Sequence, residues 1–123
     1  MLLDSNIIIY AIQGRDPALL AWLDGLPAPL CAATVTQIEV LGFHRLDGVE
    51  RARLATFFSE LVLLPFTDPI VTEAIRLRQL RRLKLGDAII AATALTHRLP
   101  LATCNTTDFT GLPALRLIDP LAI

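Results

Sequence analysis

Four acidic residues lie where predicted strands give way to predicted helices: Asp4, Glu39, Asp87 and Asp108. In an open α/β sheet, ligands bind at the carboxyl ends of the strands, so acids far apart in the sequence can meet there. Crowded carboxylates repel one another and resist ionisation. A hard cation such as Mg²⁺ or Mn²⁺ removes that penalty. The pattern therefore predicts a metal site, and a metal site in a chain of this size indicates phosphodiester chemistry.

Most of these acids also have a local interpretation. Thr36 and Glu39 have the spacing of a capping box, in which the glutamate returns to the amide of the capping residue. Asp87 suits a helix N-cap, and Asp108 suits a turn. Asp4 is harder to explain in this way, because the polar residues after it are able to cap the helix. Capping does not require a common place in the sheet, so four acids at one end favour the metal site.

Other side chains offer less chemistry. Ser5 and Thr103 have no neighbouring base that would activate them as nucleophiles. His44 and His97 each lie near a predicted helix end, and neither has a second histidine at metal-binding spacing. The chain also has no glycine-rich loop of the kind that cradles phosphates.

Five of the eleven basic residues fall within nine positions just before Asp87, and they are Arg76, Arg78, Arg81, Arg82 and Lys84. On a helix they would spread around much of the circumference, as expected for a solvated face. The functional alternative is that some of them bind phosphates near Asp87. The sequence leaves both interpretations open, and a net charge of −1 gives no general reason to expect nucleic acid.

Apolar runs with strand and helix spacing alternate along the chain. The predicted strands are 1–3, 30–33, 62–64, 101–103 and 115–118, and the predicted helices are 6–13, 17–23, 36–45, 49–61, 67–83 and 87–97. Such alternation predicts an α/β fold with a mostly parallel central sheet and helices on both of its faces. The 123 residues suit a single domain, 1–123.

The amino-acid composition indicates the environment in which the protein is expected to work. The hydrophobic fraction of 54% is high, which indicates a thick core and an apolar face for a partner chain, or else a tendency to aggregate. No apolar stretch approaches the roughly 18–20 residues of a membrane span. Two cysteines are too few for a disulfide framework, and the start of the chain is not a signal peptide. A cytoplasmic location is therefore expected.

Taken in order, the motifs resemble those of PIN-domain proteins, specifically VapC-type toxin ribonucleases. The segments that carry this resemblance are Leu3-Asp4-Ser5-Asn6, Glu39 within 36–41, Asp87 within 83–93, Thr103-Cys104-Asn105, and Asp108-Phe109. Each segment alone is common, but the ordered set spans the whole chain and is specific. The resemblance implies a three-layer α/β/α domain and a single-strand RNA endonuclease that uses Mg²⁺ or Mn²⁺.

The resemblance also implies roles for residues and partners. The family's acidic quartet corresponds to Asp4, Glu39, Asp87 and a fourth group near residue 105. Many relatives carry an acid where this chain has Asn105, and others have asparagine there and an acid three residues later, as with Asp108 here. Asn105 can bind a metal-bound water and Asp108 can supply the charge, so the fourth ligand is either of the two. We expect Asn6, Thr36 and Asn105 to support the site. Independently of the resemblance, the charge of Arg81, Arg82 and Lys84 suits them to hold the RNA backbone near Asp87. The implied partners are RNA, a second copy in a homodimer, and a VapB-like antitoxin whose C-terminal segment blocks the site.

Other classes of protein match less well. A receiver domain needs an adjacent acid pair after its first strand and a lysine after a late strand, but the one lysine here is Lys84. A phosphatase with an aspartate nucleophile needs a second aspartate where this chain has Asn6. Structure-specific DNA nucleases use additional helical segments that this chain lacks. A catalytically weakened PIN-like binding module stays open as an alternative because of Asn105.

Overall fold

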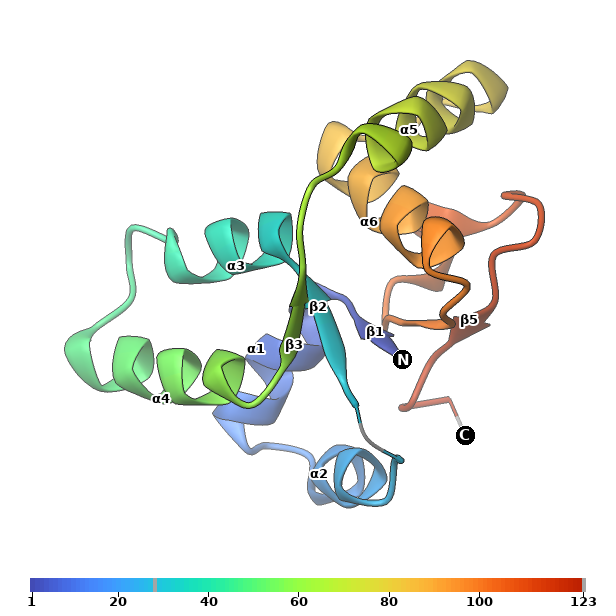
Figure 1. Ribbon diagram of the computed structural model, residues 1–123. Helices are drawn as coiled ribbons and strands as arrows, with labels where there is room; N and C mark the ends of the chain where they lie inside the picture. The colour runs from blue at the N-terminus through green and yellow to red at the C-terminus, as the bar shows by residue number, and fades with distance from the viewer. Residues whose placement is uncertain (28, 123) are drawn as a thin grey trace.

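A five-stranded parallel sheet forms the centre of the protein (Figure 1). The computed structural model describes residues 1–27 and 29–122. The strands are β1 (Leu2–Leu3), β2 (Cys31–Ala33), β3 (Val62–Leu64), β4 (Leu101–Ala102) and β5 (Leu117–Ile118). Their order across the sheet is β3-β2-β1-β4-β5, and every pairing is parallel. The predicted mostly parallel sheet is confirmed, with the first strand at its centre.

Helices cover both faces of the sheet. They are α1 (Ser5–Gln13), α2 (Pro17–Asp24), α3 (Thr34–Leu41), α4 (Gly48–Ser59), α5 (Asp68–Leu80) and α6 (Leu85–Thr96), with a short 3₁₀ helix η1 (Thr106–Phe109). Figure 1 shows α1 to α4 on one side of the strands and α5 with α6 on the other. The predicted three-layer α/β/α architecture is therefore confirmed. No helix among the described residues has the length and apolarity needed to cross a membrane.

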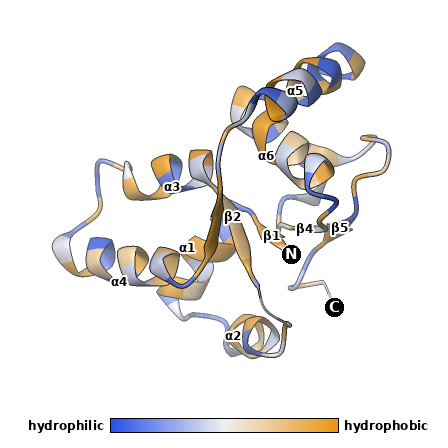
Figure 2. Ribbon diagram, viewed as in Figure 1, coloured by the Kyte–Doolittle hydropathy of each residue, from blue (hydrophilic) through white to orange (hydrophobic). Residues whose placement is uncertain are grey.

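Two apolar cores lie on either side of the sheet, because successive strand residues point to opposite faces. Leu2 packs into the core beneath α5 and α6, together with Ile90 and Phe109. Its neighbour Leu3 packs into the other core, with Ile7 of α1 and other side chains from α2, α3 and α4. Figure 2 shows the strands as predominantly hydrophobic and the helices as mixed. Because helices cover both faces of the sheet, a binding site is expected at the carboxyl ends of the strands.

Two helices begin two residues earlier than predicted. Helix α3 starts at Thr34 rather than residue 36, and its N-cap is Ala33, which makes no side-chain cap bond. The capping-box interpretation of Thr36 and Glu39 is therefore wrong, because Thr36 already lies inside the helix. Helix α6 starts at Leu85, so Asp87 is its third residue and not its N-cap. Neither Glu39 nor Asp87 therefore caps a helix in the way that the sequence suggested.

The basic residues were predicted to lie on one helix, but the structure places only Arg76 and Arg78 on α5. Helix α5 ends at Leu80, and Arg81 has an extended backbone with φ −156° and ψ 164°. Arg82 and Lys84 follow in the loop that leads to α6. The helix stops early because Leu83 is buried in the core, which turns the chain back toward the sheet. Arg81, Arg82 and Lys84 therefore lie immediately before the first turn of α6.

Candidate metal centre

The central strand places Asp4 in the middle of the carboxyl end of the sheet. The register aligns Leu2 with Leu101 and Leu3 with Ala102, so Asp4 lies beside Thr103 at the ends of neighbouring strands. The Asp4 amide continues this ladder by donating to the Ala102 carbonyl at 2.9 Å. Only 5% of the Asp4 surface is exposed. The Asp4 carboxylate is therefore almost completely buried, and its charge is poorly solvated.

A buried hydrogen-bond network fixes the orientation of Asp4. Its Oδ1 accepts from the Ser5 amide at 2.8 Å, and its Oδ2 accepts from the Thr103 hydroxyl at 2.8 Å. The Asn6 amide nitrogen donates to Asp4 Oδ2 at 3.3 Å and to Thr103 Oγ1 at 3.2 Å. The Asn105 backbone N–H also donates to Thr103 Oγ1, at 3.0 Å. Asp4 is therefore held rigidly by groups from two neighbouring strand ends.

Thr103 is a site residue to which the sequence analysis gave no role, although it lies in a segment that carries the family resemblance. It is completely buried, and its hydroxyl is the junction between Asp4, Asn6 and Asn105. The signal that identifies it is positional. Thr103 follows Leu101 by two residues, as Asp4 follows Leu2, and the parallel register aligns Leu2 with Leu101. The predicted supporting residue Asn6 lies within the same network, where its Oδ1 also accepts from the Cys104 amide at 3.1 Å.

Glu39 approaches this region from helix α3. A side chain at position 86 would place its Cβ 3.5 Å from Glu39 Oε2 and 3.8 Å from Oε1. Because Gly86 has no side chain, the Glu39 carboxylate can lie directly against the first turn of α6. Asp87 is the next residue of that turn and is half-buried. Two further predicted acids thus come together from segments about fifty residues apart.

Asp108 belongs to η1, the turn of 3₁₀ helix that follows β4. Its amide donates to the Asn105 carbonyl at 3.0 Å, so the predicted turn is present. Both Asn105 and Asp108 are exposed. The negative charge of Asp108 raises the pKa of both Asp4 and Asp87. Its backbone therefore makes the turn while its carboxylate contributes to the field of the other acids.

The four acids form one electrostatic cluster. Burial is the largest cause of a raised pKa at Asp4, Glu39 and Asp87 alike. Repulsion adds to it: Asp4 and Asp87 raise the pKa of Glu39, while Asp108 and Asp4 raise that of Asp87. At Asp4, hydrogen bonds from Thr103, Ser5 and Asn6 partly offset the shift. The cluster resists full ionisation, as expected for carboxylates that lack a counter-charge.

The donor set suits a hard divalent cation. It consists of carboxylate oxygens, with amide and hydroxyl oxygens beside them, which is the chemistry that Mg²⁺ and Mn²⁺ select. Among residues 1–27 and 29–122, no three His, Cys, Asp or Glu side chains have the geometry to enclose an ion. Asp4 is fixed by its network, whereas the carboxylates of Glu39 and Asp108 are exposed. The chemistry of the cluster thus fits the predicted ion.

A polar cavity lies beside Asp87 and Asp108. Its volume is about 440 Å³, and its other lining residues are Arg78, Arg81, Arg82, Leu83, Lys84 and Thr107. The Arg81 guanidinium donates to the Thr110 carbonyl, which joins the basic loop to the segment after η1. Lys84 and Arg81 lower the pKa of Asp87, against the larger effects that raise it. Three of the predicted RNA-binding side chains therefore line one cavity next to two of the acids.

An apolar groove begins on the other side of Glu39. Its volume is about 220 Å³, and it is lined by Ile9, Ile12, Gln13, Glu39, Val40, Phe43, Leu46, Glu50 and Leu54 of α1, α3, α4 and the α3–α4 connection. Phe43 is 51% exposed, which is unusual for an aromatic side chain in a well-packed protein. Glu39 therefore belongs both to the acidic cluster and to this groove, so a molecule in the groove would lie against the cluster.

Comparisons with known proteins show the family of the chain. The family model for the PIN domain matches residues 1–113. The chain is 30% identical to "Ribonuclease VapC" of Rickettsia bellii, over 96% of this chain and 94% of that protein. It is 32% identical to "Ribonuclease VapC10" of Mycobacterium tuberculosis, over 89% and 85% of the two chains. A solved toxin-antitoxin complex from Klebsiella pneumoniae contains a chain that is 34% identical, with a TM-score of 0.83 and coverage of 97% and 96%. The chain therefore belongs to the PIN domain family and, within it, to the VapC-type proteins.

Proposed function

We propose that the protein is a metal-dependent endonuclease for single-stranded RNA and the toxin of a toxin–antitoxin pair. The observation that carries this proposal is the cluster of Asp4, Glu39, Asp87 and Asp108 at the carboxyl end of the sheet, where burial and the neighbouring negative charges raise the pKa of Asp4, Glu39 and Asp87. The relatives named as VapC ribonucleases support the same activity for this chain. The acids would hold Mg²⁺, with Mn²⁺ as a substitute.

The bound ion would supply Lewis-acid activation of water and of the phosphodiester. The protein side chains would supply its position. Asp4 is oriented by Thr103 and Asn6 before any ligand binds, which lowers the cost of ordering the site. Glu39 and Asp108 are exposed, so they can complete the ligand set from two sides. No side chain needs to become covalently attached to the substrate.

RNA would bind along the cavity lined by the basic loop. Arg82 and Lys84 are exposed there, within the same cavity as Asp87. Charged groups of this kind bind phosphate oxygens without reading the bases. The backbone of the substrate would thus be held beside the acidic cluster. Cleavage of a cellular RNA is also the reason to propose a cytoplasmic location.

The proposed partners are a VapB-like antitoxin and a second copy of the chain. The solved complex from Klebsiella pneumoniae is a toxin–antitoxin assembly, and the apolar groove beside Glu39 suits an apolar antitoxin segment. A homodimer is supported by large apolar side chains on the surface, such as Ile38, Phe66 and Leu85, which are 73%, 53% and 62% exposed. Their burial against a partner would account for the high hydrophobic fraction.

Chelation is expected to abolish RNA cleavage by the antitoxin-free protein. EDTA would remove the ion that the acidic cluster holds, and added Mg²⁺ or Mn²⁺ would restore the activity. The measurement is gel analysis of a panel of cellular RNAs with metal, with chelator, and with metal added back. A contaminating pancreatic-type ribonuclease needs no metal, so the Asp4→Asn protein, purified in parallel, is the control for contamination. Cleavage that persists in EDTA contradicts the metal mechanism, whereas RNA binding without cleavage under all conditions supports the weakened binding module.

A further inference from the structure

Thr36 has a buried hydroxyl with no partner. The residue is completely buried, and its Oγ1 is the one inaccessible side-chain oxygen or nitrogen without a hydrogen bond among the described residues. In three other helical threonines, the hydroxyl donates to the backbone carbonyl four residues earlier. These are Thr56, Thr72 and Thr93, at 3.1, 3.2 and 2.7 Å. An unpaired buried hydroxyl is unfavourable, so its retention in a core position needs a reason.

The position of Thr36 in the first turn of α3 explains why its hydroxyl does not donate to the carbonyl four residues earlier. Helix α3 begins at Thr34, and the residue four positions before Thr36 is Ala32, which lies in strand β2. The extended backbone of a strand does not stack its carbonyl over the next helical turn, as a helix does. The Thr36 hydroxyl is therefore directed to some group outside its own turn. A position this close to the end of β2 is also close to the carboxyl end of the sheet.

Helix geometry makes Glu39 the nearest candidate to accept a hydrogen bond from the Thr36 hydroxyl. Residues three apart on a helix are neighbours on one face, and helical side chains lean toward the N-terminus. The Glu39 side chain thus leans toward the turn that contains Thr36. Its carboxylate lies against Gly86 in the first turn of α6, on the side of the other acids. Both carboxylate oxygens lie near Gly86, and Thr36 has no hydrogen bond to them in this structure.

We propose that Thr36 is a positioning residue for Glu39, whose carboxylate accepts a hydrogen bond from the Thr36 hydroxyl when it binds the divalent cation. This inference rests on the proposed function, because it requires Glu39 to be a metal ligand. Partners of this kind fix the orientation of ligating carboxylates. The hydroxyl is unpaired in the metal-free protein because its acceptor is an exposed side chain that the cation brings into place.

The test is a calorimetric titration of Mn²⁺ into wild-type protein and into variants at position 36. Thr36→Val keeps the shape but removes the hydroxyl, and it is expected to weaken Mn²⁺ binding by about 10-fold. Thr36→Ser keeps the hydroxyl and is expected to restore nearly all of the wild-type affinity. The matched control is Thr93→Val, since Thr93 is also buried in a helix but has a local partner, and its affinity is expected to stay unchanged.

A double-mutant cycle shows whether Thr36 acts through Glu39. In a Glu39→Ala background, which removes the acceptor and weakens binding by itself, adding Thr36→Val is expected to cause no further loss, because the two residues act as a unit. Thermal melting without metal is the second readout. Thr36→Val is expected to melt at or above the wild-type temperature, because it removes an unpaired polar group from the core.

The outcomes separate this inference from the proposed function. If wild type binds Mn²⁺ and Thr36→Val binds it equally well, Thr36 is not a positioning residue, and the metal site itself is unaffected. Additive losses in the cycle would overturn the role of Glu39 as the acceptor. If wild type binds no divalent cation, the proposed function fails first. Should Thr36→Val not fold, Thr36→Ser and Thr36→Ala are compared instead, since both lack the methyl group and differ only in the hydroxyl.

Discussion

Replacing Asp4 with asparagine is expected to abolish RNA cleavage and leave the metal-free protein as stable as wild type or more stable. Asp4 is buried in the middle of the acidic cluster, and asparagine keeps its shape but removes the charge that would hold the proposed cation. Loss of an outer hydrogen-bond partner of a metal ligand alone costs roughly 10–100-fold, so loss of this ligand is expected to exceed about 100-fold. Initial cleavage rates at saturating Mg²⁺ measure the effect.

The stability of the metal-free variant should depend on pH in a defined direction. Burial, more than any other cause, raises the pKa of Asp4 above its ordinary value of 3.8. Below that value Asp4 is protonated whether the chain is folded or unfolded, and there is no penalty. As the pH rises above 3.8 and through the raised pKa of the folded state, the burial of Asp4 costs the wild-type protein stability, and this contribution is absent from Asp4→Asn, whereas the contributions of Glu39 and Asp87 are present in both proteins. The difference between their melting temperatures in EDTA should therefore grow with pH and then level off.

A matched control for Asp4 is Asp119, which directly follows β5 as Asp4 directly follows β1. Asp119 lies at the outer strand of the sheet, and its Oδ1 accepts from the Leu121 amide at 3.0 Å. Asp119→Asn is expected to cleave RNA at close to the wild-type rate. If Asp4→Asn retains activity, or melts far below wild type without metal, then Asp4 is a structural residue and the metal assignment is wrong.

Neutralising Arg81, Arg82 and Lys84 together is expected to weaken RNA binding and flatten its dependence on salt. These side chains line the cavity beside Asp87 and Asp108, where they would displace counterions from the phosphates. Each lost phosphate contact should lower the log–log salt slope by roughly 0.7, so three contacts would lower it by about 3 × 0.7 = 2.1. Binding to a non-cleavable RNA across a range of salt concentrations gives the slope, and Mn²⁺ affinity should barely change.

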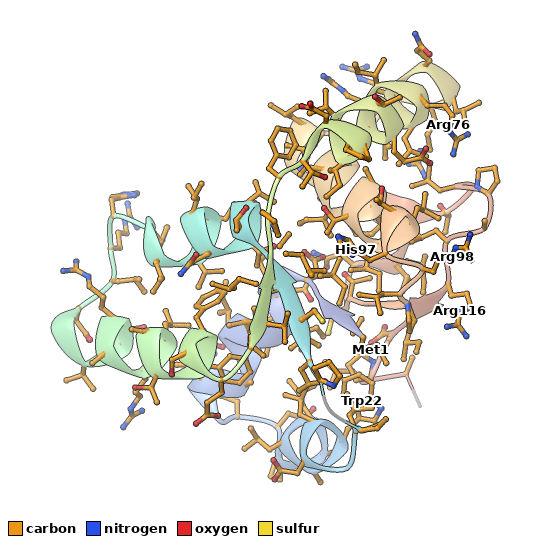
Figure 3. All side chains as sticks on the ribbon, in the orientation of Figure 1. Met1, Trp22, Arg76, His97, Arg98 and Arg116 are labelled. Atoms are coloured by element: carbon orange, nitrogen blue, oxygen red, sulfur yellow. The ribbon has the colours of Figure 1, made fainter. Side chains whose placement is uncertain are left out.

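Single variants of the basic loop should separate two roles. The Arg81 guanidinium already donates to the Thr110 carbonyl, so Arg81 also ties the loop to the segment that follows Asp108. Arg82 and Lys84 are expected to account for most of the change in slope. Arg116 is a suitable control because it precedes β5, at the opposite end of the strands, beside Arg98 in Figure 3. An unchanged slope in the triple variant would mean that the cluster is a solvated face or serves the antitoxin.

The layers of the fold were predictable because local patterns determine them. Short apolar runs separated by amphipathic helices leave few alternatives to a parallel sheet, and the predicted strands are present with their ends shifted by one or two residues. Asp4 was identified because it directly follows a run predicted to be a buried strand. The expectation that the residues after it cap the helix was wrong, since Asp4 is itself the N-cap of α1. The family assignment is confirmed by the match to the PIN domain over residues 1–113.

The parts that were wrong depend on contacts that local sequence does not encode. The start of α3 is fixed by the end of β2 rather than by a capping side chain, and the end of α5 is fixed by burial of Leu83. Thr103 was missed because its hydrogen bond to Asp4 joins positions 99 residues apart. Helical spacing placed the basic residues on α5, whereas the chain had already left the helix at Arg81. The roles of the acids and of the basic loop stay predictions.

The most direct test of the metal site is diffraction from crystals soaked in Mn²⁺ and measured at the manganese absorption edge. The expected result is an anomalous peak on the order of 2 Å from an Asp4 carboxylate oxygen, with further oxygens from Glu39, Asp87 or Asp108 around it. The same peak should be missing from crystals of Asp4→Asn. A peak that lies elsewhere in the protein, or no peak beside Asp4 at saturating Mn²⁺, would contradict the conclusion that these four acids form the metal site.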